Sequence, residues 1–224
     1  PDSVAAKVGD EPLMIVRRTG CPLVIAPDRV AAGRHLLAAH PCDVIITDDG
    51  LQHYRLQRDV EIAIVDVQRG LGNQACLPAG PLREPVSRLS SVDLVIANGA
   101  PLSQPFSMQL QIDQAVQLID GSCHKPLQKF SDTPVHGVAG IGHPQRFFEQ
   151  LQQLGLTVIP HAFSDHHIYE EADLRFDDRY PILMTEKDAV KCQHFATSDM
   201  WFVPAEALIT PATGAKILDK LRER

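Results

Sequence analysis

A short β-branched run that ends in two adjacent carboxylates constrains this chain more than any other feature. It starts at residues 44–47 and continues as Asp48, Asp49, Gly50, Leu51, Gln52 and His53. A buried strand of a parallel sheet has this composition, and open α/β folds place their ligands at the carboxyl ends of such strands. An acid there commonly holds Mg²⁺ for a nucleotide phosphate. A strand followed by an ordinary Asp-Gly turn fits the same residues, so the run alone leaves both interpretations open.

Bulk composition is that of a globular protein with room for one large domain or two small ones. The 224 residues are 44% hydrophobic and 22% charged, with a mean hydropathy of −0.08. A formal charge of −7 argues against non-specific nucleic-acid binding, which needs an excess of Lys and Arg. Five dispersed cysteines without a C-x-x-C pair indicate reduced thiols in a cytosolic protein. No stretch has the length of a membrane span, and no signal peptide is recognisable.

Short β-branched runs alternate with helical patterns along the chain, which is typical of βαβ units and a mainly parallel sheet. In the first half the pattern predicts a helix over 29–39 and strands at 44–47, 62–66 and 94–98. Residues 68–91 are rich in Gly and Pro, and a loop of that length inside a domain is usually functional or disordered.

A second unit follows. Alternating residues 108–119 suit extended strands that form a ribbon between two lobes, and a new βαβ pattern covers 135–163. Further elements are a helix over 170–176, strands at 182–185 and 201–203, and a helix over 214–221. We therefore expect three parts, with a core α/β lobe at 1–103, a β-ribbon at 104–134 and a C-terminal α/β lobe at 135–224.

Four groups of residues have the chemistry of a site, and each also has an ordinary structural explanation. Asp10 with Glu11 precedes a proline and is equally an N-cap acid. The pair Arg83 and Glu84 lies between prolines, and is equally a surface ion pair worth about 0–1 kcal/mol. The strand-end cluster of residues 48–53 is the third group. Residues 165–167, an Asp and two His, follow a predicted strand and suit proton transfer or metal binding.

Several enzyme classes do not match. Adjacent histidines and the absence of H-E-x-x-H argue against zinc, and no G-x-S-x-G elbow occurs. The turn at 140–142 has only half of a dinucleotide fingerprint, so an oxidoreductase ranks last. Carboxylates combined with arginines and a histidine fit Mg²⁺-assisted phosphoryl transfer better.

The motifs resemble those of the tetraacyldisaccharide 4′-kinase family, which acts in lipid A biosynthesis. Matching blocks occur in order over nearly the whole chain, at residues 8–12, 47–62, 77–84, 92–99, 139–148, 165–166 and 184–191. The resemblance implies an α/β fold in which a P-loop-NTPase-like parallel-sheet lobe joins a second, smaller α/β lobe through a β-ribbon. It implies transfer of the ATP γ-phosphate to the 4′-hydroxyl of a tetraacyl disaccharide 1-phosphate, by an enzyme that contacts the cytoplasmic face of the bacterial inner membrane peripherally.

The resemblance also implies roles for nine residues. Asp10 would be the base for the sugar hydroxyl, paired with His166. Asp48 would stand at the Walker-B position and, with Asp49 and Glu84, serve Mg²⁺ or its shell. The remaining residues would meet the disaccharide or the phosphates: Arg29, Gln52, His53 and Arg83.

One departure from the family pattern changes the expected activity. The family's phosphate loop lies upstream of the matched region, and these 224 residues contain no G-x-x-x-x-G-K-[ST]. Without that cradle the β- and γ-phosphates lose the backbone N–H groups and the lysine that hold them. We therefore predict a fragment that is soluble but inactive by itself. A non-catalytic lipid- or nucleotide-binding module derived from such a kinase remains the alternative.

Overall fold

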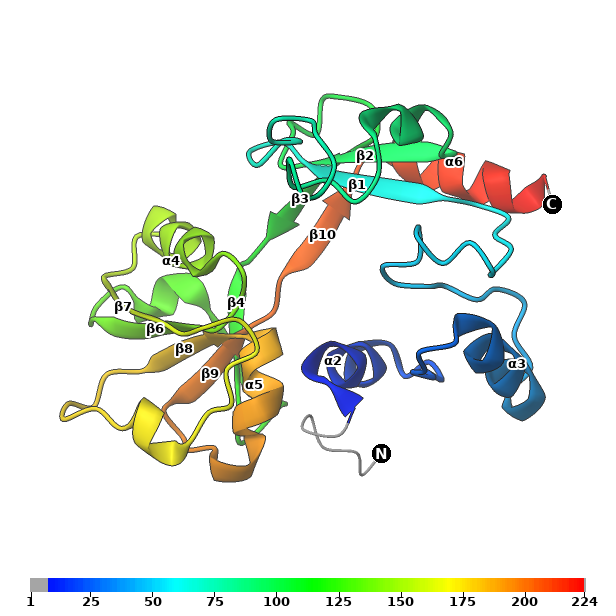
Figure 1. Ribbon diagram of the computed structural model, residues 1–224. Helices are drawn as coiled ribbons and strands as arrows, with labels where there is room; N and C mark the ends of the chain where they lie inside the picture. The colour runs from blue at the N-terminus through cyan, green and yellow to red at the C-terminus, as the bar shows by residue number, and fades with distance from the viewer. Residues whose placement is uncertain (1–7, 224) are drawn as a thin grey trace. The chain divides into compact units, whose positions relative to one another are not determined.

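The computed structural model describes residues 8–223, which form two compact units (Figure 1). Unit 1 contains residues 8–43 and 112–205, and unit 2 contains residues 44–111 and 206–223. The predicted three-part division at 103/104 and 134/135 follows other boundaries, and it stays a prediction. The α/β class expected from the alternating pattern is confirmed in both units.

Unit 1 is built on a six-stranded sheet with the order β5-β4-β9-β8-β6-β7. Its strands are β4 (Gln114–Gln117), β5 (His124–Pro126), β6 (Val135–Ala139), β7 (Val158–Ala162), β8 (Ile182–Thr185) and β9 (Met200–Val203). Pairing is parallel from β7 through β6 and β8 to β9, and antiparallel at β4 and β5. Because the carboxyl ends of parallel strands share one edge, the loops after β6, β7 and β8 lie together there.

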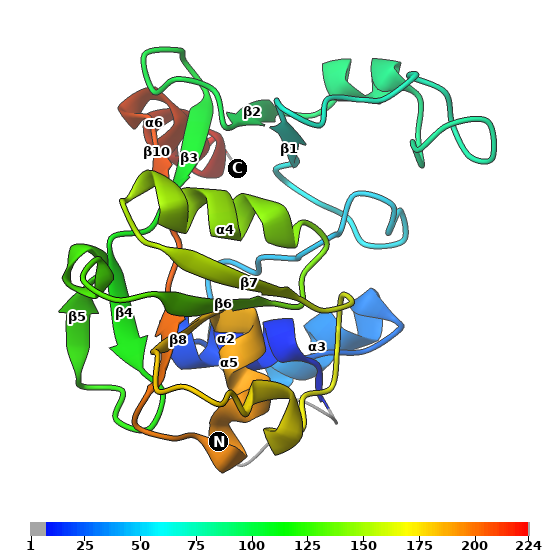
Figure 2. The same ribbon diagram turned by 90° about the vertical axis from the view of Figure 1, so that its left-hand side faces the viewer.

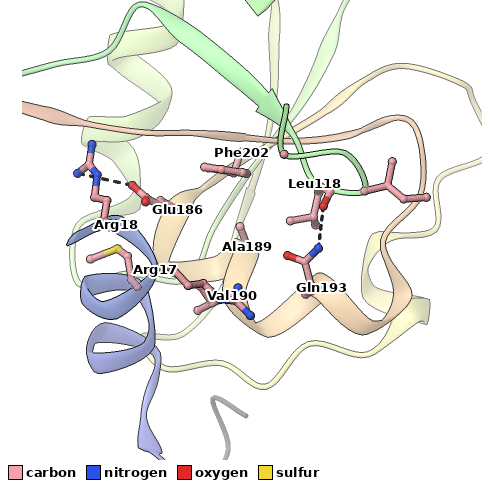
Figure 3. Close-up of a pocket in the computed structure, with 11 residues that line it drawn as sticks. Arg17, Arg18, Leu118, Glu186, Ala189, Val190, Gln193 and Phe202 are labelled. Carbon is pink, nitrogen blue, oxygen red and sulfur yellow. Dashed lines mark hydrogen bonds and ion pairs between the residues drawn. The ribbon is translucent and has the colours of Figure 1, made fainter. Parts of the chain in front are cut away.

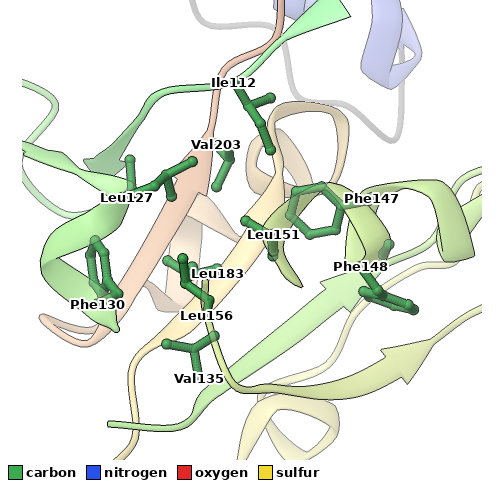
Figure 4. Close-up of a cluster of buried hydrophobic side chains, with 12 residues drawn as sticks. Ile112, Leu127, Phe130, Val135, Phe147, Phe148, Leu151, Leu156, Leu183 and Val203 are labelled. Atoms are coloured by element: carbon green, nitrogen blue, oxygen red, sulfur yellow. The ribbon is translucent and has the colours of Figure 1, made fainter. Parts of the chain in front are cut away.

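Helices cover both faces of this sheet (Figure 2). The helices of unit 1 are α2 (Asp10–Thr19), α3 (Arg29–Ala39), α4 (Pro144–Gln153) and α5 (Glu186–Cys192), with short 3₁₀ turns η2 (Leu127–Phe130), η3 (Glu171–Leu174) and η4 (Gln193–Phe195). Helices α4 and α5 are the two that lie directly against the sheet. Helix α4 lies on one face, where Phe147, Phe148 and Leu151 pack against Val135 and Leu183 (Figure 4). Helix α5 lies on the other face with a second core cluster, and α2 packs against α5.

Unit 2 has a four-stranded sheet with the order β1-β2-β3-β10. Its elements are β1 (Ile62–Asp66), η1 (Val86–Ser90), β2 (Leu94–Asn98), β3 (Ser107–Gln111), β10 (Glu206–Ile209) and α6 (Pro211–Arg222). The first three strands are parallel, and β10 pairs with β3 in the antiparallel sense. Strand β1 is an edge strand whose partner in the sheet is β2.

The predicted strand at 44–47 is wrong. These residues are irregular, and the side chains of Val44 and Ile46 are 53% and 91% exposed. Strand preference mainly reflects packing and pairing with neighbours, and no described strand pairs with this segment. Composition suited to a strand was therefore not sufficient to form one.

Most of the other expected elements are present. The predicted helix over 29–39 and strands at 62–66, 94–98 and 182–185 match α3, β1, β2 and β8 residue for residue. The expected helix over 170–176 is reduced to the 3₁₀ turn η3, and α2, α5, β5 and β10 were not predicted. No helix within residues 8–223 is long and apolar enough to cross a membrane.

Candidate active site

Asp10 is the first residue of α2, and the local sequence explains why the helix begins there. Gly9 adopts φ 89, a conformation that favours glycine, and Pro12 is accepted in the first turn because it lacks only a donor that the helix does not need. Two acids in that first turn, Asp10 and Glu11, complement the positive end of the helix dipole. Asp10 is 6% exposed, so its carboxylate is fixed inside the unit.

His166 meets Asp10 across the unit. It lies in the loop after β7, and its Nδ1 is 3.4 Å from Asp10 Oδ2. The backbone of His166 has φ 59, a left-handed conformation that strains a residue other than glycine. Such strain is concentrated at functional sites. The structure therefore brings together the two residues predicted as a catalytic pair, although they lie far apart in the sequence.

Two lysines of α5 complete this cluster, and the sequence interpretation gave neither of them a role. Lys187 Nζ is 3.0 Å from Glu11 Oε1, 3.3 Å from Asp165 Oδ1 and 4.0 Å from Asp10 Oδ2. Lys191 Nζ is 3.8 Å from Asp10 Oδ2. The available signal was their position directly behind the predicted strand 182–185, where site residues collect at the carboxyl edge of a parallel sheet.

Buried partners of the lysines give this side of the cluster a fixed geometry. Asp188 is fully buried, and its Oδ1 is 2.8 Å from Lys191 Nζ. Its Oδ2 accepts hydrogen bonds from the Gly140 N–H at 2.9 Å and from the Thr185 hydroxyl at 2.6 Å. The ring of Tyr169 lies 5.1 Å from Lys191 Nζ. The loops after β6 and β8 thus converge on one carboxylate.

Electrostatic effects in the cluster follow from these contacts. Burial lowers the pKa of the Lys187 ammonium, but Glu11, Asp10 and Asp165 outweigh it, and the pKa is raised. Burial raises the pKa of Asp165, but the hydrogen bond and the charge of Lys187 outweigh it, so the pKa is lowered. Burial, and then the charge of Asp188, raises the pKa of the Tyr169 hydroxyl. These three residues therefore keep their ordinary protonation states near neutral pH, with Lys187 and Asp165 charged and Tyr169 protonated.

Arg29 lies elsewhere on unit 1. It is the first residue of α3, and Asp28 caps that helix by accepting hydrogen bonds from the Val30 and Ala31 N–H groups at 2.9 and 3.1 Å. The Arg29 side chain is half-buried. Its role toward the phosphates or the sugar stays a prediction.

The other six predicted site residues belong to unit 2, where the structure joins two of them. Gln52 Nε2 donates a hydrogen bond to Glu84 Oε2 at 2.7 Å, and the Tyr54 hydroxyl donates to Glu84 Oε1. The Tyr54 hydrogen bond, followed by the one from Gln52, lowers the pKa of Glu84. His53 is half-buried, and its backbone N–H donates a hydrogen bond to the Gly50 carbonyl. Arg83 is exposed.

Asp48 and Asp49 form an exposed turn, in which Asp49 has φ 48. Within residues 8–223, no three His, Cys, Asp or Glu side chains are placed to hold a metal ion. Mg²⁺ usually takes only one or two carboxylates and fills its shell with water and substrate phosphate. The two exposed carboxylates fit that kind of site. The assignment of Asp48, Asp49 and Glu84 to Mg²⁺ stays a prediction.

A pocket of ≈ 440 Å³ in unit 1 lies apart from the predicted residues (Figure 3). It is lined by Arg17 and Arg18 of α2 together with Glu186, Val190 and other residues of α5 and its surroundings. Arg18 is already engaged, since it donates to the Ala205 carbonyl at 2.8 Å and lies 3.7 Å from Glu186. None of the nine predicted site residues lines this pocket.

The family model described as tetraacyldisaccharide-1-P 4′-kinase matches residues 1–222. The chain belongs to this family. Curated tetraacyldisaccharide 4′-kinases include one from Nitrosococcus oceani, 53% identical over 223 residues, covering 100% of this chain and 66% of that protein. Another, from Pseudomonas aeruginosa, is 52% identical over 211 residues, covering 93% and 63%.

A solved relative agrees on the fold. The crystal structure of the "apo" form of LpxK from Aquifex aeolicus in complex with ATP superposes with a TM-score of 0.73. It is 24% identical in sequence, and the match covers 97% of this chain and 70% of that one. This chain therefore spans just under two thirds of the length of the curated tetraacyldisaccharide 4′-kinases it matches. The family suspected from the motifs is confirmed.

Proposed function

We propose that the full-length protein containing this chain transfers the γ-phosphate of ATP to the 4′-hydroxyl of a tetraacyl disaccharide 1-phosphate. The buried Asp10 carboxylate, 3.4 Å from His166, is the observation that carries this proposal. Membership of the family supports the acceptor, because the name of the family specifies a tetraacyldisaccharide 1-phosphate. The solved relative from Aquifex aeolicus is a complex with ATP, which supports ATP as the phosphate donor.

Asp10 is the proposed general base. Its carboxylate accepts the proton of the 4′-hydroxyl while that oxygen bonds to the γ-phosphorus, and the bond from the γ-phosphorus to the β,γ-bridging oxygen breaks, so that ADP leaves. His166 lies beside Asp10 Oδ2 and holds the carboxylate toward the acceptor. A phosphate ester and ADP are formed, and the proton remains on the carboxyl group of Asp10.

The remaining predicted residues bind and orient the substrates. Asp48 and Asp49, together with Glu84, would hold Mg²⁺, which supplies positive charge to the phosphate oxygens when bound. Arg29 and Arg83 supply cations for phosphate groups, since guanidinium pairs with phosphate in a fixed geometry. Gln52 and His53 supply hydrogen bonds to the disaccharide. The acceptor is a lipid, so we place the enzyme at the cytoplasmic face of the inner membrane, in peripheral contact.

Asp10→Asn and His166→Gln, made in the full-length protein, test the proposal. General-base catalysis contributes roughly 10²–10⁴-fold, so Asp10→Asn should lower kcat by about that factor while ATP affinity changes little. Phosphate transfer from labelled ATP to the lipid is the measurement. Glu171→Gln is the matched control, because Glu171 is an exposed acid of the same unit that pairs with Arg175. Near-normal turnover in Asp10→Asn would remove the proposed role of the carboxylate.

The alternative of a non-catalytic binding module predicts a different result. A module would bind the lipid or ATP without transferring phosphate, whether or not Asp10 is intact. We also expect the 224 residues alone to show no transfer. Lipid phosphorylation by that polypeptide would contradict this expectation.

A further inference from the structure

Lys191 is a lysine whose charged end is removed from solvent. Its side chain is 9% exposed, and Nζ lies between Asp188 Oδ1 at 2.8 Å and Asp10 Oδ2 at 3.8 Å. The face of the Tyr169 ring is 5.1 Å away. Lysine is almost never this buried unless it is paired, because taking an ammonium out of water is costly. Such a placement indicates a specific task for the charge.

Asp188 fixes where that charge lies. Its Oδ2 accepts from the Gly140 N–H at 2.9 Å and the Thr185 hydroxyl at 2.6 Å, which leaves Oδ1 for Lys191. Gly140 is needed for this approach: a Cβ there would lie 2.7 Å from the Tyr169 hydroxyl and 3.1 Å from Asp188 Oδ1. The ends of β6 and β8 therefore clamp the Asp188–Lys191 pair.

The two oxygens of the Asp10 carboxylate have different surroundings: Oδ1 accepts a hydrogen bond from the Glu11 backbone N–H at 3.1 Å, whereas neighbouring cations act on Oδ2. Its Oδ2 is buried and has no hydrogen-bond donor among the described residues. Lys187 is farther away, at 4.0 Å, and it is shared with Glu11 at 3.0 Å and Asp165 at 3.3 Å. Lys191 is shared with a single further carboxylate within residues 8–223, that of Asp188. Since Coulomb attraction falls with distance and is stronger away from water, Lys191 is the buried cation that acts most directly on Asp10.

We propose that Lys191, clamped by Asp188, is a positioning residue that turns the Asp10 carboxylate so that Oδ2 faces His166 and the acceptor hydroxyl. This inference rests on the proposed function in one respect, since it assumes that Asp10 accepts the proton of that hydroxyl. It adds that a pair on α5, which makes no proposed contact with substrate, holds the first residue of α2 in its working orientation.

Kinetics of the full-length protein provide the first test. Displacing a reacting group by about 1 Å costs roughly 10²-fold, so Lys191→Met should lower kcat by about 10- to 100-fold while KM for ATP and for the lipid stays within about twofold. Lys125→Met is the matched control, because Lys125 Nζ also lies over an aromatic ring, 4.0 Å from Phe130, on β5. It should behave as wild type.

A second variant separates positioning from folding. Lys191→Met alone leaves the buried Asp188 charge without its partner, which is strongly destabilising. The double variant Asp188→Asn/Lys191→Met removes both charges and should fold with a wild-type melting profile, yet its kcat should remain low. Recovery of wild-type kcat in the double variant would overturn the proposal and leave the pair a purely structural role.

An NMR measurement separates failure of this inference from failure of the proposed function. The ring ¹⁵N resonances of His166 report its contact with Asp10, whether or not the protein is a kinase. In the double variant they should move toward the values seen in Asp10→Asn, whereas Lys125→Met should leave them in place. Unchanged His166 resonances in the double variant would refute the inference. Absence of kinase activity with shifted resonances would count against the function alone.

Discussion

Units 1 and 2 differ in how completely they bury their apolar residues. Both core clusters, formed by residues such as Phe148 and Met184, belong entirely to unit 1, whose six-stranded sheet has helices on both faces. Unit 2 has a four-stranded sheet and a few buried positions such as Leu94 and Ile96, and Ile46 is 91% exposed.

This difference indicates that the predicted site residues of unit 1 are held in place by packing, whereas those of the Asp48–Asp49 turn are not. In unit 1, Asp10 is buried and surrounded by charges that are themselves held by the core. In unit 2, the Asp48–Asp49 turn is exposed. A group fixed by packing has its geometry before substrate arrives, and so catalysis does not depend on ordering it later. The predicted base thus lies in the better-packed unit.

The strongest challenge to this comparison is an apolar truncation in each unit. Phe148→Ala should lower the free energy of unfolding by about 3–5 kcal/mol, because Phe148 is 2% exposed and its removal leaves a cavity. Ile46→Ala should change it by no more than about 0.5 kcal/mol. Urea unfolding followed by circular dichroism measures both. Equal losses would mean that unit 2 packs as well as unit 1.

A glycine substitution tests how tightly unit 1 is packed around Gly140. Gly140→Ala should destabilise by about 1–3 kcal/mol, since the new Cβ would lie 2.7 Å from the Tyr169 hydroxyl. Gly33→Ala is the matched control, because nothing lies within 4 Å of its added Cβ and alanine favours the helix by about 0.5–1 kcal/mol. Thermal unfolding of both variants gives the result. A tolerated Gly140→Ala would show that the clamp on Asp188 is loose.

A smaller effect is expected at the turn of unit 2. Arg58 donates to the Gly50 and Leu51 carbonyls at 3.0 and 3.2 Å and pairs with Glu61 at 2.7 Å. Arg58→Met should cost up to about 1 kcal/mol, because Arg88 still pairs with Glu61. Hydrogen exchange over residues 48–56 should become faster. Exchange no faster than in Arg69→Met, an exposed control in the same unit, would show that Arg58 does not hold the turn.

The smallest effect is a pH dependence in unit 1. Burial, and then the charge of His136, lowers the pKa of His161, while Asp178 acts in the opposite direction. His136 Nδ1 lies 2.9 Å from His161 Nε2, and Asp178 Oδ1 lies 2.8 Å from His136 Nε2. As pH falls, the histidine of the unfolded chain therefore binds a proton before His161 of the folded protein does. The contribution of His161 to the free energy of unfolding is complete above the unfolded pKa of 6.5, and it is lost as pH falls below that value.

Trp201, the only tryptophan of the chain, lies on β9 and reports on unit 1. Its fluorescence follows urea unfolding at two pH values, about one unit below and about one unit above the unfolded histidine pKa. The urea midpoint should be lower at the lower pH, and His161→Gln should reduce the difference between the two midpoints. His124→Gln is the control, because His124 is exposed on β5. An unchanged pH dependence in His161→Gln would assign the effect to other groups.

Local sequence was most informative where a segment carries its own periodicity and flanking signals. Helix α3 has the cap Asp28, and β1, β2 and β8 are short apolar runs with clear ends, so their bounds could be read directly. The segment 44–47 has an equally clear strand composition and forms none, because pairing partners are not encoded in the segment itself. The 3₁₀ turn η3, in place of a longer helix, shows the same dependence on context.

The sequence by itself determined the family and the α/β class, because motifs and the alternation of strand and helix patterns are local properties. The same motifs predicted that Asp10 and His166 act as a pair. Only the tertiary structure decided that Lys187 and Lys191 surround Asp10, and that the Gly140 N–H from the loop after β6 holds Asp188. Those contacts join α2 to the loops after β6, β7 and β8. Residues far apart in the chain meet there because parallel strands bring their carboxyl ends to one edge, and that edge exists only after the sheet has formed.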